Sequence, residues 1–210
     1  MKYIISPDAQ MGYPVLTPEQ INTYISQGYK YRERRYKQTT DHRDYEVICA
    51  EIWKEGEQEH TVVIPAFLVP HRPYPLEVYI YAANLYSGDP NVSQRVAAEA
   101  TKKRFGLDTF SRSTISRIMK ELSQTLEENG LAETSDASEE QMKKQEEVKN
   151  DDGDKAGHRG ALTARDTKKR RESIKKFFKD RLDVNSRRGF METCTRMAIW
   201  WHARFNRLLI

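Results

Sequence analysis

The stretch TFSRSTISRIM, from Thr109 to Met119, combines the start of a helix with one apolar stripe. Ser111 fits the N-cap position, where a side-chain oxygen accepts hydrogen bonds from the unpaired N–H groups of the first helical turn. Apolar residues then recur at three- and four-residue steps, which is the spacing of a helix face packed on a core. These residues are Ile115, Ile118, Met119, Leu122 and Leu126. The sequence therefore predicts an amphipathic helix that begins at about Ser111.

The opposite face of this predicted helix is basic and rich in hydroxyl groups. It carries Arg112, Ser113, Ser116, Arg117 and Lys120, and no carboxylate follows until Glu121. Cations placed between short hydroxyl side chains suit an anionic partner that forms hydrogen bonds. DNA is the obvious candidate.

Two more helices are predicted upstream. The stretch LEVYIYAANLYS (residues 76–87) has helical periodicity, with one side formed by Leu76, Tyr79, Ile80, Ala83 and Tyr86. A second helix begins near Ser93, and its predicted buried stripe consists of Val96, Ala97 and Ala100. The cations Lys102, Lys103 and Arg104 follow at the C-terminal end of that helix, where they complement the helix dipole.

The order of these three helices resembles the helix-turn-helix of DNA-binding proteins. Gly106 permits the turn between the second and third helices. Small alanines on the second helix allow a close crossing with the third. A plain three-helix bundle would show the same periodicity and is the alternative interpretation.

Residues 1–75 predict a small α+β module. Thr17 and Pro18 fit the N-cap and first position of a short helix. YIIS (3–6) is a short strand candidate before this helix. After the helix, the patterns in YKYRERRYKQ, YEVICAEIWKEG and HTVVIP predict a β-meander. The arginines on its polar faces are explained by an ordinary solvated strand face. Four prolines in IPAFLVPHRPYP exclude a helix interior or a central strand, so this segment predicts a joint.

Charge divides the chain into three parts. Residues 1–126 hold 16 Lys and Arg against 15 Asp and Glu, residues 127–154 hold 3 against 11, and residues 155–210 hold 16 against 5. Their net charges are thus +1, −8 and +11, which points to separate roles for the acidic and basic parts. The acidic part has few large apolar residues and no aromatic ring, so residues 129–160 predict a disordered linker.

Residues 161–210 predict a basic amphipathic helical hairpin. Thr163 fits the cap of its first helix, and a second helix begins at about Ser186. Their apolar stripes are Ile174, Phe177, Phe178 and Leu182, and then Phe190, Cys194, Met197, Ala198, Trp201, Phe205 and Leu208. Three roles stay open for this hairpin: packing on itself or on the helix-turn-helix, contacting phosphates, or lying on a membrane surface.

Composition limits the class of protein further. The start of the chain lacks the basic residues and long apolar core of a signal peptide, and no run of about 18 apolar residues occurs. The cysteines Cys49 and Cys194 lie far apart and form no C-x-x-C pair, which argues against a disulfide framework. We therefore expect a soluble cytoplasmic protein that does not span a membrane. Catalytic motifs with supporting context are absent, so we expect no enzymatic activity and no cofactor.

The stretch IPAFLVPHRPYPLEVYIYAANLY followed by a helix-turn-helix resembles the N-terminal region of an uncharacterised family of bacterial insertion-sequence proteins. The resemblance covers roughly residues 30–125 and implies a zinc-ribbon-like β module joined to a helix-turn-helix. In those relatives the β module carries paired cysteine ligands. Here only Cys49 lies in that region, with His42 and His60 nearby, so we expect no bound metal.

The sequence thus predicts an α+β protein in four parts: an α+β module (1–75), a helix-turn-helix (76–128), an acidic disordered linker (129–160) and a C-terminal helical hairpin (161–210). Its predicted function is to read double-stranded DNA by placing the third helix in a major groove, as a transposase-related protein without a catalytic half. The predicted DNA contacts are Lys102, Lys103, Arg104, Ser111, Arg112, Ser113, Thr114, Ser116, Arg117 and Lys120. The alternative is a protein-interaction adaptor that uses the acidic linker and the aromatic C-terminal helices.

Overall fold

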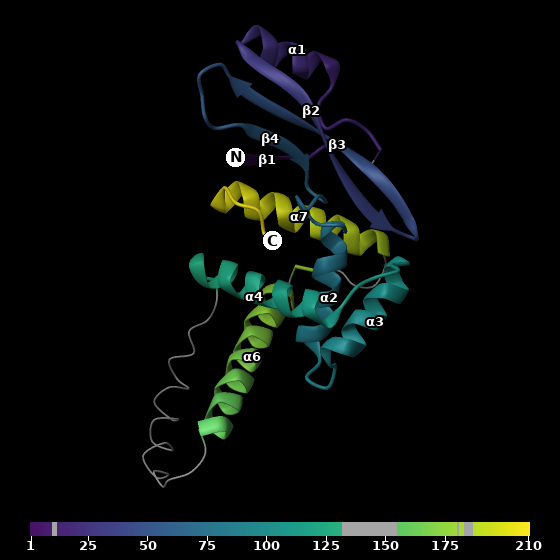
Figure 1. Ribbon diagram of the computed structural model, residues 1–210, viewed down its shortest axis with the longest axis vertical. Coiled ribbons are helices and arrows are strands. Elements are labelled where there is room, and N and C mark those ends of the chain that lie inside the picture. The colour runs from purple at the N-terminus through teal and green to yellow at the C-terminus, as the bar shows by residue number, and fades with distance from the viewer. Residues whose placement is uncertain (10–11, 132–154, 180, 183–186) are drawn as a thin grey trace.

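The computed structural model describes all residues except 10–11, 132–154, 180 and 183–186. Within that part the chain forms one four-stranded sheet and six helices, which confirms the predicted α+β class. The sheet lies at one end of the molecule and most of the helices lie at the other (Figure 1). No helix among the described residues is long and apolar enough to cross a bilayer.

The sheet contains β1 (Lys2–Ser6), β2 (Tyr29–Thr40), β3 (Arg43–Lys54) and β4 (Thr61–Pro65) in the order β1-β4-β3-β2. Consecutive strands β2, β3 and β4 pair in antiparallel fashion, so the predicted meander is confirmed. The short strand β1 adds to the other side of β4 in parallel. Periodicity alone does not assign this partner, because the pairing is formed by residues about 60 positions apart.

Side chains alternate between the two faces of the sheet, and each face has its own apolar cluster. One face carries Ala50, Ile52 and Val63, which pack with Val15 and Leu16 near helix α1. Helix α1 (Pro18–Ser26) begins as predicted, with a capping box formed by Thr17 and Gln20. The other face packs toward the helices through Tyr36, Val47, Cys49, Val62 and Ile64, and Leu68 from the segment after β4 joins the same cluster.

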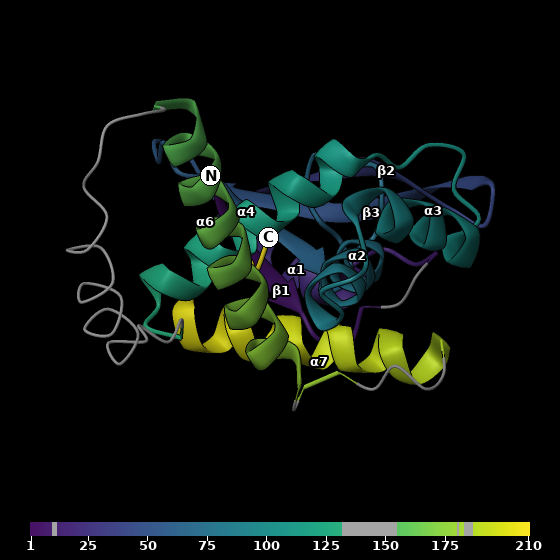
Figure 2. The same cartoon turned by 90° about the horizontal axis from the view of Figure 1, so that it is seen from below.

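The helical half is built around α2 (Leu76–Gly88), followed by α3 (Gln94–Phe105), α4 (Arg112–Glu128), α6 (Lys155–Lys179) and α7 (Arg187–Phe205). Figure 2 shows α4 and α7 on opposite sides of α2. Because α2 lies between other elements, it is buried on more than one side. The five predicted core residues of α2 are buried. Val78 and Ala82 are buried too, so α2 is buried on more sides than the single predicted one.

Helix α3 starts at the predicted cap, Ser93, but its buried side is rotated from the predicted stripe. Val96 is 55% exposed, so its assignment to the core was wrong. The buried residues are instead Ala97, Ala98, Thr101 and Phe105. This rotation buries the large Phe105 ring and leaves the small alanines at the helix contact.

The C-terminal helices share one hydrophobic core with α2, α3 and α4. Phe178 of α6 and Trp201 of α7 belong to the same apolar cluster as Ile118 of α4. His202 of α7 also donates a hydrogen bond from Nε2 to the carbonyl oxygen of Tyr3 in β1, at 3.0 Å. The predicted apolar stripes therefore pack on the rest of the protein and, through Phe177 and Trp201, on each other. The packing interpretation is thus confirmed, and contact with phosphates or with a membrane surface stays a prediction.

Helix α6 begins at Lys155, before the predicted cap. Thr163 therefore lies inside the helix and does not cap it. Residues 155–160, predicted as linker, are helical, because this region contains no proline and Ala161 and Leu162 favour helix. Residues 129–131, also predicted as linker, are ordered: Asn129 is the C-cap of α4, and Leu131 packs against the core. Residues 132–154 and the predicted hairpin joint at 183–185 lie outside the described residues.

The tip of the β2–β3 hairpin is hydrogen-bonded to the turn between α3 and α4. The backbone N–H of Asp41 donates to the carbonyl of Phe105 at 2.8 Å, and that of His42 donates to the carbonyl of Gly106 at 2.7 Å. His42 Nδ1 also lies 2.9 Å from a carboxylate oxygen of Asp108. The sheet thus fixes the turn that precedes α4.

Gly106 is required at this contact for two reasons. Its φ of +54° is a left-handed conformation that side chains disfavour, and a Cβ there would lie 2.9 Å from the Cα of Asp41. We expect Gly106→Ala to lower the free energy of unfolding by about 1 to 3 kcal/mol. Chemical denaturation measures this loss, with Gly56→Ala as the control because φ is also positive there and its Cβ meets nothing within 4 Å. If both variants lost the same free energy of unfolding, the close contact between Gly106 and Asp41 would make no contribution to stability.

Candidate nucleic-acid interface

The first turn of α4 forms as its sequence predicts. Ser111 is the N-cap, and its side-chain oxygen accepts a hydrogen bond from the backbone N–H of Thr114 at 3.3 Å. The Ser111 hydroxyl also lies 2.7 Å from that of Ser113 and 3.1 Å from that of Thr114. Three hydroxyl groups therefore gather at the positive end of the helix dipole.

The buried face of α4 is the predicted one. Ile115, Ile118, Leu122 and Leu126 are 0% exposed, and Met119 is 3% exposed. This apolar stripe holds α4 against the core along most of its length. The side chains opposite it are consequently directed to solvent.

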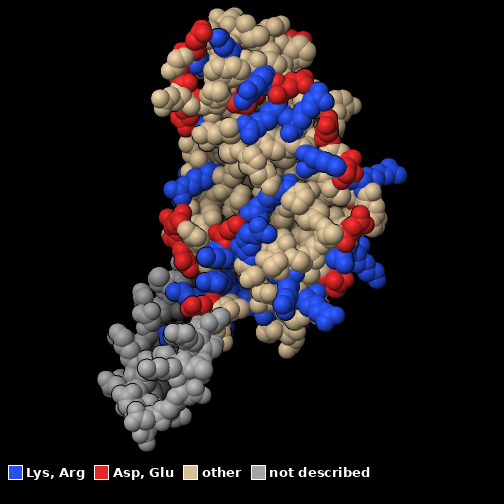
Figure 3. All heavy atoms as spheres, in the orientation of Figure 1, with Lys and Arg blue, Asp and Glu red and all other residues tan. Residues whose placement is uncertain are grey.

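That solvent side carries the basic group predicted from the sequence. Arg112, Arg117 and Lys120 are all exposed, and none of them forms an ion pair within the part of the chain that the structure describes. Ser113 and Ser116 are exposed between these cations. The first carboxylate, Glu121, is already paired with Arg72. In Figure 3, Lys and Arg side chains lie across the helical half, with most of the visible Asp and Glu toward its sides.

The three cations predicted at the end of α3 have different surroundings. Lys103 is exposed, whereas Lys102 is half-buried and lies 3.4 Å from Glu99. The guanidinium of Arg104 is centred 4.6 Å from the ring of Tyr81 and 5.8 Å from that of Phe190 in α7. Arg104 thus packs on aromatic rings as a cation–π partner. This placement does not favour the predicted role of Arg104 as a DNA contact, because the rings of Tyr81 and Phe190 lie against its guanidinium.

A cavity of about 510 Å³ opens beside the start of α4. We call it the α4 pocket. It is lined by the loop 70–74, the first turn of α2 and the N-terminal half of α4, namely by Pro70, His71, Arg72, Pro73, Tyr74, Tyr79, Thr109, Phe110, Ser111, Thr114, Arg117 and Glu121. Three predicted contact residues, Ser111, Thr114 and Arg117, therefore face a concave site as well as the outer surface of the helix.

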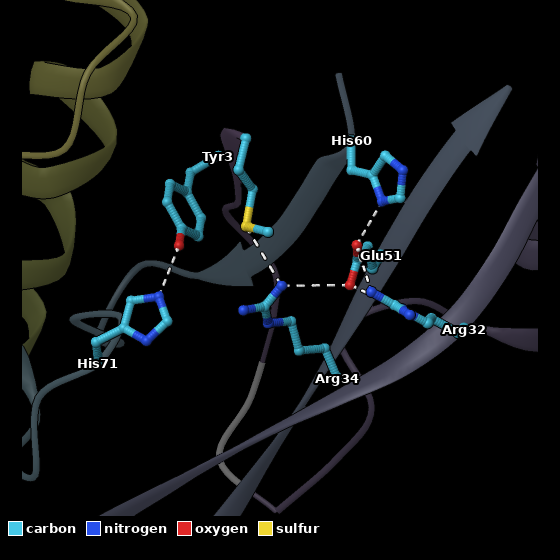
Figure 4. A network of polar contacts seen from close by, with 7 residues as sticks. Tyr3, Arg32, Arg34, Glu51, His60 and His71 are labelled. Carbon is cyan, nitrogen blue, oxygen red and sulfur yellow. Dashed lines mark hydrogen bonds and ion pairs between the residues drawn. The ribbon is translucent and has the colours of Figure 1, made fainter. Parts of the chain in front are cut away.

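A second polar cluster lies on the sheet and surrounds the buried carboxylate of Glu51 (Figure 4). Arg32 donates two hydrogen bonds to it at 2.9 Å, Arg34 lies at 3.3 Å, and His60 Nδ1 lies at 2.7 Å. Burial alone would raise the pKa of Glu51. The hydrogen bonds from Arg32 and His60 and the charges of both arginines outweigh burial, and they lower the pKa to about 2. This cluster joins β2, β3 and the start of β4.

The lowered pKa of Glu51 predicts a pH-dependent stability. Since the folded pKa is about 2 and the ordinary value is 4.5, ionised Glu51 stabilises the fold above pH 4.5. The contribution, on the order of 3 kcal/mol, is lost as pH falls from about 4.5 toward 2. Urea unfolding from pH 7 to 3 should show a shallower decline for Glu51→Gln than for the parent. Glu55→Gln, at an exposed ion pair with Lys30, should follow the parent, and a parallel decline in all three proteins would contradict this account.

The residues considered as zinc ligands lie in different places. Cys49 is buried in the sheet, where burial raises the pKa of its thiol to about 12. His60 contacts Glu51, and His42 contacts Asp108 near α3. Across the described residues, no group of three or more His, Cys, Asp and Glu side chains is arranged to hold a metal ion.

The chain matches no protein-family model, no curated protein and no solved structure. The resemblance to insertion-sequence proteins therefore rests on the sequence motifs alone and stays a prediction. Any function for α4 has to be argued from its own surface and surroundings.

Sequence reasoning missed the far wall of the α4 pocket. The sequence predicts only a proline-rich joint for IPAFLVPHRPYP (64–75), yet this segment supplies Arg72 and Tyr74. The guanidinium of Arg72 pairs with Glu121 and lies 5.4 Å from the ring centroid of Tyr79. A basic residue between prolines was the one available signal, but its partner lies 49 residues further along the chain.

Proposed function

We propose that this protein binds double-stranded DNA through the N-terminal half of α4. The observation that carries the proposal is the exposed side of that helix, where three cations without ion-pair partners in the described structure alternate with hydroxyl side chains. A surface cation is usually balanced by neighbouring acids, and this side has none before Glu121. Such a surface favours a polyanion that accepts hydrogen bonds.

The surroundings of α4 support its use as an inserted helix. A major groove about 12 Å wide admits one α-helix, provided that the helix is held from behind. Ile115 and Ile118 hold the rear of α4, and the hairpin contact at Gly106 fixes the turn before it. The basic end of the helix is therefore presented on a rigid support.

Each exposed residue has a role in this proposal. Arg112 and Arg117 reach base edges or phosphates, and Ser113, Thr114 and Ser116 form hydrogen bonds near the helix start. Lys120 and Lys103 contact phosphates on either side. A relation to mobile elements would follow from the motif resemblance and forms a separate, finer proposal.

The adaptor alternative has less support. It needs the aromatic residues of the C-terminal helices to be available, yet Phe177, Phe178, Phe190 and Trp201 belong to the core. Trp200 is 38% exposed and Met191 is 37% exposed, which is a small surface for an anchored protein contact.

Selection from random duplex DNA with the full chain, followed by fluorescence titration at several salt concentrations, tests the proposal. We expect affinity to fall steeply with salt, because each neutralised phosphate releases about 0.9 counterion. The double variant Arg112→Ala/Lys120→Ala should release up to about two fewer counterions on binding, which appears as a shallower slope of log affinity against log salt concentration. Arg196→Ala removes an exposed arginine from α7, away from α4, and should leave binding unchanged. The proposal fails if no duplex binds at low salt, or if the double variant and the control behave alike.

A further inference from the structure

The α4 pocket contains charged and hydroxyl side chains that a DNA backbone, being convex, would not fill. Its walls bring Arg117 of α4 and Arg72 of the loop 70–74 to one cavity. Glu121 is the one carboxylate among the residues that line it, and it pairs with Arg72. Two guanidinium groups against one carboxylate, next to the positive end of the α4 dipole, favour an anion.

Hydroxyl groups add hydrogen-bonding capacity to the same cavity. The Tyr74 hydroxyl donates to the backbone carbonyl of Thr109 and lies 2.9 Å from Thr109 Oγ1, so the Thr109 hydroxyl is the one of the two that remains able to donate to a ligand. Tyr79 is 1% exposed, and its hydroxyl oxygen accepts a hydrogen bond from the backbone N–H of Tyr74 at 3.3 Å. Its own O–H has no acceptor among the residues that the structure describes. The Tyr79 hydroxyl thus already has one partner, and its O–H can still donate to an oxygen of a ligand in the cavity.

The positions of the two arginines relative to Tyr79 agree with this description. Burial raises the pKa of Tyr79 to about 12, and the backbone hydrogen bond and the charges of Arg72 and Arg117 act in the opposite direction. Arg117 and Arg72 both line the cavity, so their charges act there. An anion placed there would meet both cations.

The size and the apolar wall indicate more than a bare inorganic ion. A volume of about 510 Å³ is that of a small-molecule site. Tyr74, Tyr79 and Phe110 form a group of rings whose centroids lie 5.7 to 6.3 Å apart, and this group lines the cavity. An organic group next to the anionic centre would cover this ring surface.

We propose that the α4 pocket binds a small phosphate monoester, with the phosphate held by Arg117, Arg72 and the first turn of α4. The ester group packs against the ring wall. Because Ser111, Thr114 and Arg117 belong to both sites, ligand and DNA compete, a consequence that rests on the proposed function. The pocket itself does not depend on DNA binding.

Isothermal titration of the full chain with AMP, at constant ionic strength, tests the pocket. Adenosine and inorganic phosphate are the matched probes. We expect AMP to bind with a Kd below about 1 mM, phosphate to bind more weakly, and adenosine to give no signal. Arg117→Ala should weaken AMP binding by about tenfold or more, since a hydrogen-bonded charge is lost. Glu121→Gln should strengthen it by about threefold, because a repelling charge is removed and Arg72 is released.

Two controls make the result specific. Arg196→Ala should bind AMP as the parent does, and thermal melts should show that all variants are folded. The pocket proposal is overturned if AMP gives no signal up to about 10 mM, or if Arg117→Ala and Glu121→Gln both leave its affinity unchanged. Equal binding of adenosine and AMP would also overturn it, because phosphate would then not be recognised.

A DNA titration with and without saturating AMP separates this proposal from the proposed function. Competition predicts that AMP lowers the apparent affinity for duplex DNA. Unchanged DNA affinity would overturn the competition. If AMP binds and no duplex does, the pocket stands and the DNA-binding function falls, whereas the reverse outcome removes the pocket and leaves DNA binding intact.

Discussion

Replacing Trp201 with alanine should lower the free energy of unfolding by about 3 to 5 kcal/mol, because the large ring leaves a cavity. Trp201 is 0% exposed, and its ring centroid lies 5.8 Å from that of Phe177 in α6 and 4.5 Å from that of Phe205. The indole N–H has no partner among the described residues, so the loss arises from packing and not from a hydrogen bond. Chemical denaturation followed by circular dichroism measures the change.

The matched control is Trp200→Ala, at the adjacent, 38% exposed ring. We expect a loss of at most about 1 kcal/mol there, since surface substitutions have small effects. If α7 shares one core with α2 and α4, Trp201→Ala should also increase hydrogen exchange in those helices. Faster exchange confined to residues 187–205, with no change in residues 76–128, would show that the C-terminal helices fold as a separate unit.

The sequence best predicted those elements that depend on residues close to one another in the chain. The caps at Thr17, Ser93 and Ser111 depend on hydrogen bonds within three residues of the cap, and all three occur in the structure. The buried stripe of α4 was equally predictable, because that helix is buried on one side only. The meander followed from two short turns between neighbouring strands.

Predictions failed where one element is covered by another that is distant in sequence. Helix α2 is enclosed because α6 and α7 pack on it as well as α3 and α4, and residue periodicity contains no information on these additional neighbours. Arg104 was assigned to the surface for the same reason, although Phe190 covers it. Val96 was assigned to the core because it is apolar, but the position of Phe105 fixes the rotation of α3.

The candidate site was predictable only in part. The exposed cations of α4 follow from the same periodicity that gives its buried stripe. The α4 pocket cannot be predicted from periodicity, because it forms where the proline-rich loop contacts α4, which is distant in sequence. The ion pair between Arg72 and Glu121 belongs to this tertiary contact. An isolated arginine between prolines gives no indication of the helix that it reaches.

Paired substitutions at neighbouring positions of α4 should separate the proposed binding surface from the core. Ile118 is 0% exposed, so Ile118→Ala should destabilise the fold by about 2 to 5 kcal/mol through the cavity it leaves. Arg117 is exposed and has no ion-pair partner in the described structure, so Arg117→Ala should leave stability within about 0.5 kcal/mol of the parent. Denaturation curves of both variants test these two values.

The effects of these two substitutions on DNA affinity should be the reverse of their effects on stability. Arg117→Ala should weaken binding to a selected duplex by about 1 to 3 kcal/mol, the range for a lost base contact, while binding to unrelated duplexes changes less. Ile118→Ala, measured under conditions in which it is fully folded, should retain most of the affinity because its side chain lies behind the helix. Arg196→Ala serves as the charge control. If Arg117→Ala binds every duplex as the parent does, at low and high salt alike, α4 is not the reading helix, because an arginine in that position cannot enter a groove without contributing to affinity.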